Sequence, residues 1–75
     1  MAEPQLIDVR GLKCPLPVLK AARRMRELGS GARLTLLTDD PMAAVDVPNF
    51  CREERHRLLA VSRDGKTLRF EIEKG

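Results

Sequence analysis

Cys14 is the residue whose type and surroundings point most directly to chemistry. It follows the flexible Gly11 and precedes Pro15 and Pro17. Proline fits the first turn of a helix, where backbone N–H groups have no partner within the helix. Apolar residues then recur at helical spacing, at Val18, Ala21, Ala22, Met25 and Leu28. Cys14 is therefore expected at or next to the N-cap, where Ser, Thr, Asp or Asn would cap better, so we interpret it as a chemical residue.

The chemistry expected of Cys14 is that of a moderately activated thiolate, the nucleophilic form of cysteine. The positive end of the helix dipole favours the thiolate and predicts a modestly lowered pKa for the thiol. Lys13 and Arg10 would add to this effect if they point toward the sulfur. Pro17 has no N–H group, so Leu16 is the main expected backbone donor to the sulfur. We expect an exposed sulfur on a rigid turn, against the alternative of a buried structural cysteine.

The residues near Cys14 in the sequence lack the partner groups that most catalytic cysteines need. No histidine lies nearby to act as a base, and no second cysteine lies two residues away to resolve a disulfide. A lone thiolate can still attack a persulfide, take its outer sulfur and pass it on. The residues therefore favour a carrier over a stand-alone enzyme. They predict no cofactor beyond a covalent persulfide and no metal site, because His56 is the only histidine and no cysteines have zinc spacing.

The second cysteine, Cys51, has a different expected role. It lies beside Phe50 on an expected amphipathic helix, and free cysteines are often buried. We interpret it as a core residue, and the alternatives are a redox role or a second sulfur site. A protein that cycles a disulfide between Cys14 and Cys51 would need their Cα atoms within ~7 Å.

Length and charge limit the class of protein. The chain has 75 residues, which predicts one domain over 1–75. The formal net charge is +3 and the pI about 9.3, which suits an acidic partner. The first residues have neither a basic region nor an apolar run, so no signal peptide is expected, and no segment is apolar enough to cross a membrane. We expect a cytoplasmic protein.

The chain alternates strand and helix patterns. The expected elements are a strand Leu6–Arg10, a helix from about Pro15 to Leu28 ending at Gly29, a strand Arg33–Asp39, a helix of roughly Val47–Arg55, and strands Leu58–Arg63 and Thr67–Glu73. Met42–Val47 is expected as a separate short turn, because Pro48 argues against one continuous helix, and Asp46 is the expected N-cap of the second helix. Asp64-Gly65 predicts a two-residue hairpin.

These elements predict an α/β fold, a two-layer α/β sandwich of order βαβαββ. The four-stranded mixed sheet would carry both helices on one face. Ile7 and Val9, then Leu34, Leu36 and Thr38, then Leu68, Phe70 and Ile72 would point toward the helices. The other face, with Thr35, Arg69 and Glu71, would be left to water or a partner.

The charged residues of the first helix have two possible roles. Lys20, Arg23 and Arg24, with Arg26 at the flank, form either a solvated face or, with Lys13, a docking surface for acidic partners close to Cys14. Asp39 and Asp40, adjacent and followed by Pro41, are interpreted as turn formers. His56 is expected at the surface or at a helix end.

Three blocks of this sequence resemble the TusA/SirA-like sulfur-carrier family. The first runs from Asp8 to Pro17 and contains Cys-Pro-x-Pro. The others are Thr38-Asp39-Asp40-Pro41 and Asp46-Val47-Pro48-Asn49-Phe50-Cys51. The resemblance covers nearly the whole chain. It implies the βαβαββ sandwich, a persulfide carried on Cys14, and a supporting motif of Asp8, Gly11, Pro15, Leu16 and Pro17.

The resemblance also implies partners. The donor would be a cysteine desulfurase, a rhodanese or another persulfide donor, and the acceptor a protein such as a DsrE-like sulfurtransferase. The pathway stays open among tRNA thiolation, cofactor synthesis and sulfur oxidation, because tRNA-thiolation members carry an acidic residue at the position of Leu16. The alternative function is a small basic nucleic-acid-binding or regulatory module. No direct nucleic-acid binding is expected, since Tyr and Trp are absent and Phe50 and Phe70 are expected in the core.

Overall fold

The computed structural model describes residues 5–75. Its elements in chain order are β1 (Gln5–Asp8), α1 (Leu16–Glu27), β2 (Arg33–Thr38), α2 (Ala43–Glu53), β3 (Arg57–Asp64) and β4 (Thr67–Glu73). Residues 1–4, on which most of the signal-peptide prediction rests, lie outside the described residues. None of the helices within residues 5–75 is long and apolar enough to cross a membrane.

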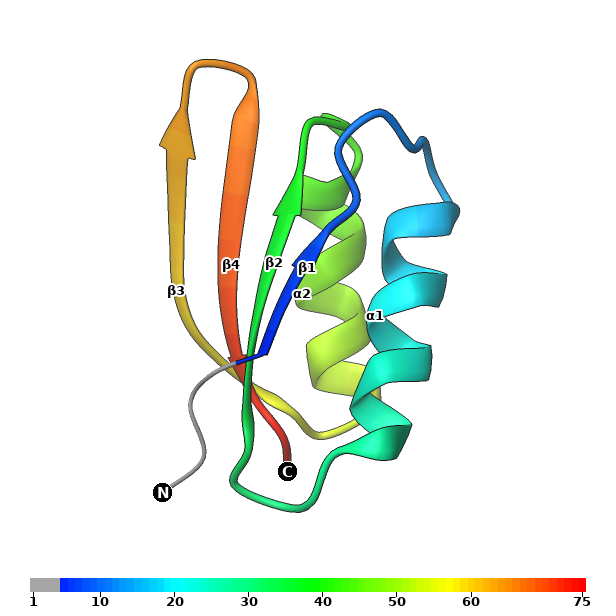
Figure 1. The fold of residues 1–75 in the computed structure, drawn as a ribbon, viewed down its shortest axis with the longest axis vertical. Helices are drawn as coiled ribbons and strands as arrows, with labels where there is room; N and C mark the ends of the chain where they lie inside the picture. Colours follow the sequence, from blue (N-terminus) through cyan, green and yellow to red (C-terminus); the bar gives the residue numbers. More distant parts are fainter. Residues whose placement is uncertain (1–4) are drawn as a thin grey trace.

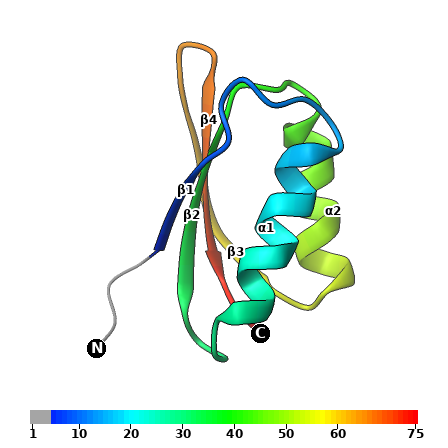
Figure 2. The same cartoon turned by 45° about the vertical axis from the view of Figure 1, so that its right-hand side comes forward.

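The four strands form one mixed sheet of order β1-β2-β4-β3. β1 and β2 are parallel, whereas β4 is antiparallel to both β2 and β3. Both helices cover the same face of this sheet (Figures 1 and 2). The predicted two-layer βαβαββ sandwich is therefore confirmed.

The parallel strands determine where the site forms. β1 and β2 end at the same edge of the sheet, and both helices begin at that edge (Figure 1). The loop from β1 to α1 and the loop from β2 to α2 consequently meet there. In open α/β sheets, the carboxyl ends of parallel strands are the usual place for a ligand.

The core lies between the helices and the sheet, as the alternating pattern predicts. Leu36, Phe70 and Ile72 have no exposed surface. Phe50 and Cys51 on α2 are buried with them, so the prediction that both pack in the core is confirmed. Phe50 and Phe70 are the only Phe, Tyr or Trp side chains of the sequence, and both are buried. Within the described residues, no Phe, Tyr or Trp ring is therefore exposed for stacking against a nucleic-acid base.

The opposite face of the sheet differs from the prediction at Thr35. This residue is buried rather than open to water, and its Oγ1 donates a hydrogen bond of 2.6 Å to Glu71 Oε1 across the β2–β4 pair. Glu71 Oε1 also forms an ion pair with Arg69 Nε, at 3.5 Å. The Glu71 side chain, hydrogen-bonded to Thr35 from the neighbouring strand, therefore lies against it.

The prediction of a separate turn at 42–47 followed by a helix capped by Asp46 is wrong. α2 is continuous from Ala43 to Glu53 with Pro48 inside it, and Met42 is its N-cap. Pro48 removes one backbone hydrogen bond, but Val47 and Phe50 beside it are buried against the sheet. Burying such side chains contributes roughly 1.5–3 kcal/mol each, which offsets the lost bond. Asp46 therefore lies within the helix and does not cap it.

Two turns also differ from the prediction by small shifts. The hairpin residues are Gly65 and Lys66, because Asp64 already pairs with Thr67. Gly65 has a φ of 61°, as the first central residue of a type II′ hairpin requires. α1 ends at Glu27, and Gly31, not Gly29, takes the left-handed backbone conformation, with a φ of 86°.

Candidate functional site

Cys14 lies in the loop between β1 and α1 and is exposed, as predicted. Pro15 is the N-cap of α1, and its peptide bond to Cys14 is cis. The prediction that the Leu16 N–H donates to the sulfur is wrong, because this N–H donates to the Lys13 carbonyl at 2.9 Å. That hydrogen bond closes the turn ahead of the helix.

Two adjacent aspartates hold the Cys14 loop at both ends. Asp39 Oδ1 accepts a hydrogen bond of 2.9 Å from the Gly11 N–H, and Asp40 Oδ2 accepts one of 2.5 Å from the Cys14 N–H. Gly11 has a φ of 89°, a conformation that favours glycine. Asp40 Oδ1 also accepts from the Met42 N–H at 3.1 Å, so its predicted role as a turn former is confirmed. No local sequence signal indicates the links from both aspartates to the Cys14 loop, because they join residues 28 and 26 positions apart.

The sulfur itself faces a third carboxylate. Cys14 Sγ donates a hydrogen bond of 2.9 Å to Asp46 Oδ2 on α2. This bond, together with partial desolvation and the negative charges of Asp46 and Asp40, raises the pKa of the Cys14 thiol above its usual value. The prediction of a lowered pKa is therefore wrong, because the carboxylates beside the sulfur favour the protonated thiol over the thiolate.

Cys14 opens onto a groove of about 430 Å³ between α1 and α2. Cys14 and Asp46 contribute to it together with apolar side chains from both helices and with two further carboxylates. The groove is lined by Cys14, Pro15, Val18, Ala22, Asp46, Asn49, Phe50, Glu53 and Glu54.

The other predicted motif residues support the loop rather than the sulfur. Asp8 ends β1 and forms a two-pronged ion pair with Arg10, with N–O distances of 2.9 and 2.7 Å. Arg10 lowers the pKa of the Asp8 carboxyl to about 2. Arg10 therefore pairs with Asp8, and it is not among the groups that shift the pKa of Cys14. Pro17 is buried on α1, whereas Leu16 between the two prolines is exposed.

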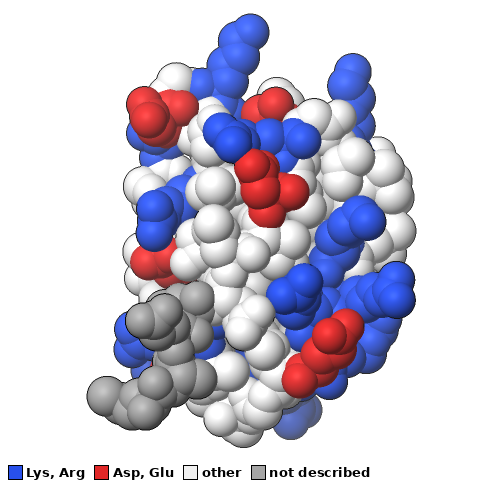
Figure 3. Space-filling model, viewed as in Figure 1, with Lys and Arg blue, Asp and Glu red and all other residues white. Residues whose placement is uncertain are grey.

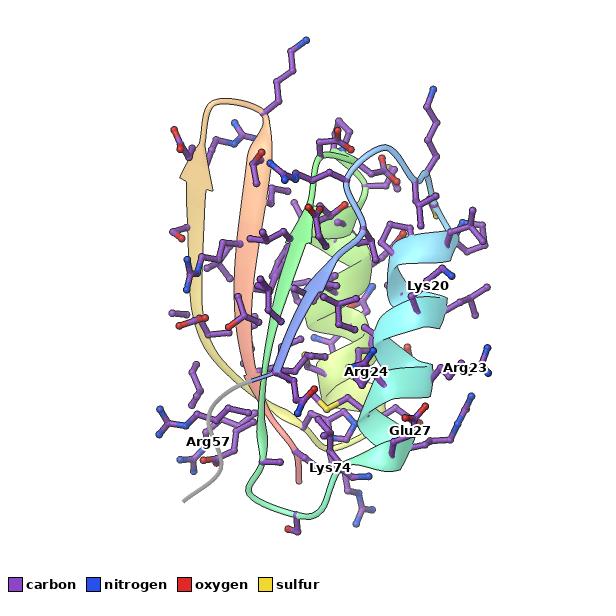
Figure 4. All side chains as sticks on the ribbon, in the orientation of Figure 1. Lys20, Arg23, Arg24, Glu27, Arg57 and Lys74 are labelled. Atoms are coloured by element: carbon purple, nitrogen blue, oxygen red, sulfur yellow. The ribbon has the colours of Figure 1, made fainter. Side chains whose placement is uncertain are left out.

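The basic residues of α1 gather at a second hollow. Lys20, Arg23 and Arg24 line it with Ile7 and Glu27, in a volume of about 300 Å³. Arg24 Nη1 donates a hydrogen bond of 3.1 Å to Gln5 Oε1 on β1. Figure 3 shows Lys and Arg side chains gathered around this part of α1, and Figure 4 labels Lys20, Arg23, Arg24 and Glu27 along the helix. Lys13 is exposed. None of these four cations lines the groove beside Cys14.

Cys51 and His56 do not reach the groove. Both cysteines are free thiols, and burial raises the pKa of the Cys51 thiol to about 11. The His56 ring packs on Phe50 with centroids 5.4 Å apart, and its Nδ1 accepts from the Gly75 N–H at 3.1 Å. Within residues 5–75, no three His, Cys, Asp or Glu side chains are grouped as metal ligands.

These features define a small two-layer α/β protein with one exposed thiol, held by carboxylates at the mouth of a groove. The chain matches the family described as sulfurtransferase TusA over residues 5–74 and belongs to that family. A solved structure of a SirA-like protein from Desulfitobacterium hafniense is similar to it, with a TM-score of 0.82 and 25% sequence identity. The match covers 93% of this chain and 96% of that one. The predicted family is confirmed, which supports a sulfur-carrier role with protein partners in sulfur relay.

Proposed function

We propose that this protein carries sulfur as a persulfide on Cys14. The observation that carries the proposal is the exposed sulfur at the mouth of the groove, hydrogen-bonded to Asp46 at 2.9 Å. Neither a histidine nor a second cysteine lines that groove, within the described part of the chain. Such a site suits transfer between partners that bring their own chemistry.

The transfer step exchanges one sulfur–sulfur bond for another. The electron pair of the Cys14 sulfur attacks the outer sulfur of a donor persulfide, R–S–SH, and forms a new S–S bond. The donor's S–S bond breaks, and the donor's inner sulfur leaves as a thiolate with the electron pair of the broken bond. Asp46 accepts the Cys14 proton during the attack, and the departing thiolate then takes it. The sum is Cys14–SH plus R–S–SH giving Cys14–S–SH plus R–SH, with no net oxidation.

The partners follow from this step. The donor is a cysteine desulfurase, a rhodanese or another protein that presents a persulfide, and the acceptor is a protein such as a DsrE-like sulfurtransferase. Because the sulfur is carried covalently, no bound cofactor takes part. The delivered sulfur would serve tRNA thiolation, cofactor synthesis or sulfur oxidation. A thiol that must stay reduced between transfers fits the cytoplasm.

The test is intact-mass measurement after incubation with cysteine and a cysteine desulfurase, with and without reductant. Wild type and Cys51→Ser should gain one sulfur atom that reductant removes, whereas Cys14→Ser should gain none. The same series with thiosulfate and a rhodanese covers the second donor class. Sulfur on Cys14→Ser, or no sulfur on wild type with either donor, would overturn the proposal.

A further inference from the structure

The groove beside Cys14 has a charge opposite to that of the protein as a whole. Its lining contains the carboxylates Asp46, Glu53 and Glu54 and no Lys or Arg, although the chain's formal net charge is +3. Within residues 5–75, neither Glu53 nor Glu54 forms an ion pair. Both are exposed. Two carboxylates therefore stand free at the end of α2, in the same groove as the thiol.

The groove also has a defined length and floor. Asp46 and Glu53 are seven residues apart on one helix, so they lie on the same face about 10.5 Å apart along the axis, and Glu54 lies about 12 Å from Asp46. Between the two ends, Val18 and Ala22 on α1 and Phe50 on α2 give the groove an apolar floor. The thiol, the floor and the glutamates thus follow one another along the line between the helices.

We infer that this groove binds an extended, cysteine-bearing segment of a partner protein, with a basic side chain four positions from that cysteine. An extended chain rises about 3.3 Å per residue, and alternate side chains face the same way. With the partner's cysteine at Cys14, the side chain two positions away faces the apolar floor. The side chain four positions away lies about 13 Å along the groove, where Arg or Lys meets Glu53 and Glu54.

The partner's identity as a sulfur donor or acceptor rests on the proposed function, but the specificity of the groove can be tested without it. The probes are five-residue peptides with cysteine at one end, leucine in the centre and either arginine or glutamate at the other end, made in both chain directions. Each peptide cysteine is joined by a disulfide to thionitrobenzoate. The protein is Cys51→Ser, which leaves Cys14 as its one thiol.

In this assay the Cys14 sulfur attacks the peptide sulfur and forms a mixed disulfide. The bond to thionitrobenzoate breaks, and the coloured thiolate leaves with the electron pair. For at least one chain direction, the arginine peptide should react about fivefold faster than the glutamate peptide at low salt, the effect of one or two exposed ion pairs. The preference should shrink near 1 M salt, where the Debye length is about 3 Å.

Glu53→Lys is the decisive variant and Glu27→Lys its matched control. The two make the same change of charge, but Glu27 lines the basic hollow on α1 instead of the groove. Glu53→Lys should abolish or invert the preference for arginine, and Glu27→Lys should leave it in place. Equal rates for arginine and glutamate peptides in both directions, or a preference that survives Glu53→Lys, would overturn the inference. Failure to load sulfur from any donor would contradict the proposed function and leave this result unaffected.

Discussion

Replacing Asp40 by alanine tests whether the two loops hold each other in place. Its carboxylate accepts hydrogen bonds from the Cys14 N–H at 2.5 Å and the Met42 N–H at 3.1 Å, and so links the start of α1 to the start of α2. Hydrogen bonds to a charged group contribute about 1.5–3 kcal/mol each. Water can replace part of this at Cys14, because Cys14 is exposed. We therefore expect Asp40→Ala to lower the free energy of unfolding by about 2 kcal/mol.

The assay is urea unfolding followed by far-UV circular dichroism, since the chain has no Trp or Tyr for fluorescence. A loss of about 2 kcal/mol should also lower the melting temperature by roughly 8–16 °C in a domain of this size. Asp64→Ala is the matched control, because the Asp64 side chain makes no hydrogen bond within residues 5–75. It should change stability by less than about 0.5 kcal/mol. An Asp40→Ala variant as stable as Asp64→Ala would refute the link between the loops.

Three further predictions concern the titrating groups. Asp46→Asn should bring the pKa of Cys14 down toward its usual value, so the pH midpoint for alkylation by iodoacetamide should fall; an unchanged midpoint would contradict the role of Asp46. Native protein at roughly pH 9 should take one alkyl label, on Cys14, because burial raises the pKa of Cys51 to about 11. Unfolded protein should take two labels. Labelling of Cys51 in the native protein, detected by mass spectrometry, would contradict its burial. The pKa of the Asp8 carboxyl falls from 3.8 to about 2 on folding, so its ion pair stabilises the protein above pH 3.8 and is lost as the pH falls to about 2. The urea midpoints of wild type and Asp8→Asn should therefore differ near neutral pH and approach each other in that window. A difference at pH 2 as large as that near neutral pH would exclude this cause.

The sheet and the first helix could be predicted because their residues follow simple periods. Leu34, Leu36 and Thr38 alternate along β2, and all three are buried. Such patterns reflect which side of a strand or helix packs against the core, and they can be read from the order of apolar and polar residues. The observed strand ends differ from the predicted ones by one or two residues, whereas the predicted core-facing residues of β2 and β4 face the core.

The second helix could not be predicted by the same rules, because packing there outweighs a local preference. Pro48 argues locally for a break, whereas Val47 and Phe50 on either side are buried in the core and keep α2 continuous. Once the helix begins at Ala43, Asp46, Asn49 and Glu53 share a face at spacings of three and seven. A helix that begins at Ala43 would thus have predicted that these three side chains line one groove.

The state of the sulfur depends on the fold more than on its neighbours in sequence. Local rules predict a lowered pKa for Cys14 from the helix start, yet Asp46, 32 residues away, raises it. The parallel pairing of β1 and β2 produces this meeting, because it brings the loop with Cys14 to the same edge as the loop that leads into α2. A carboxylate hydrogen-bonded to the sulfur favours the thiol over the thiolate, the form that oxidants attack more readily. The same carboxylate is placed to accept the proton when the sulfur attacks, as the proposed transfer step requires.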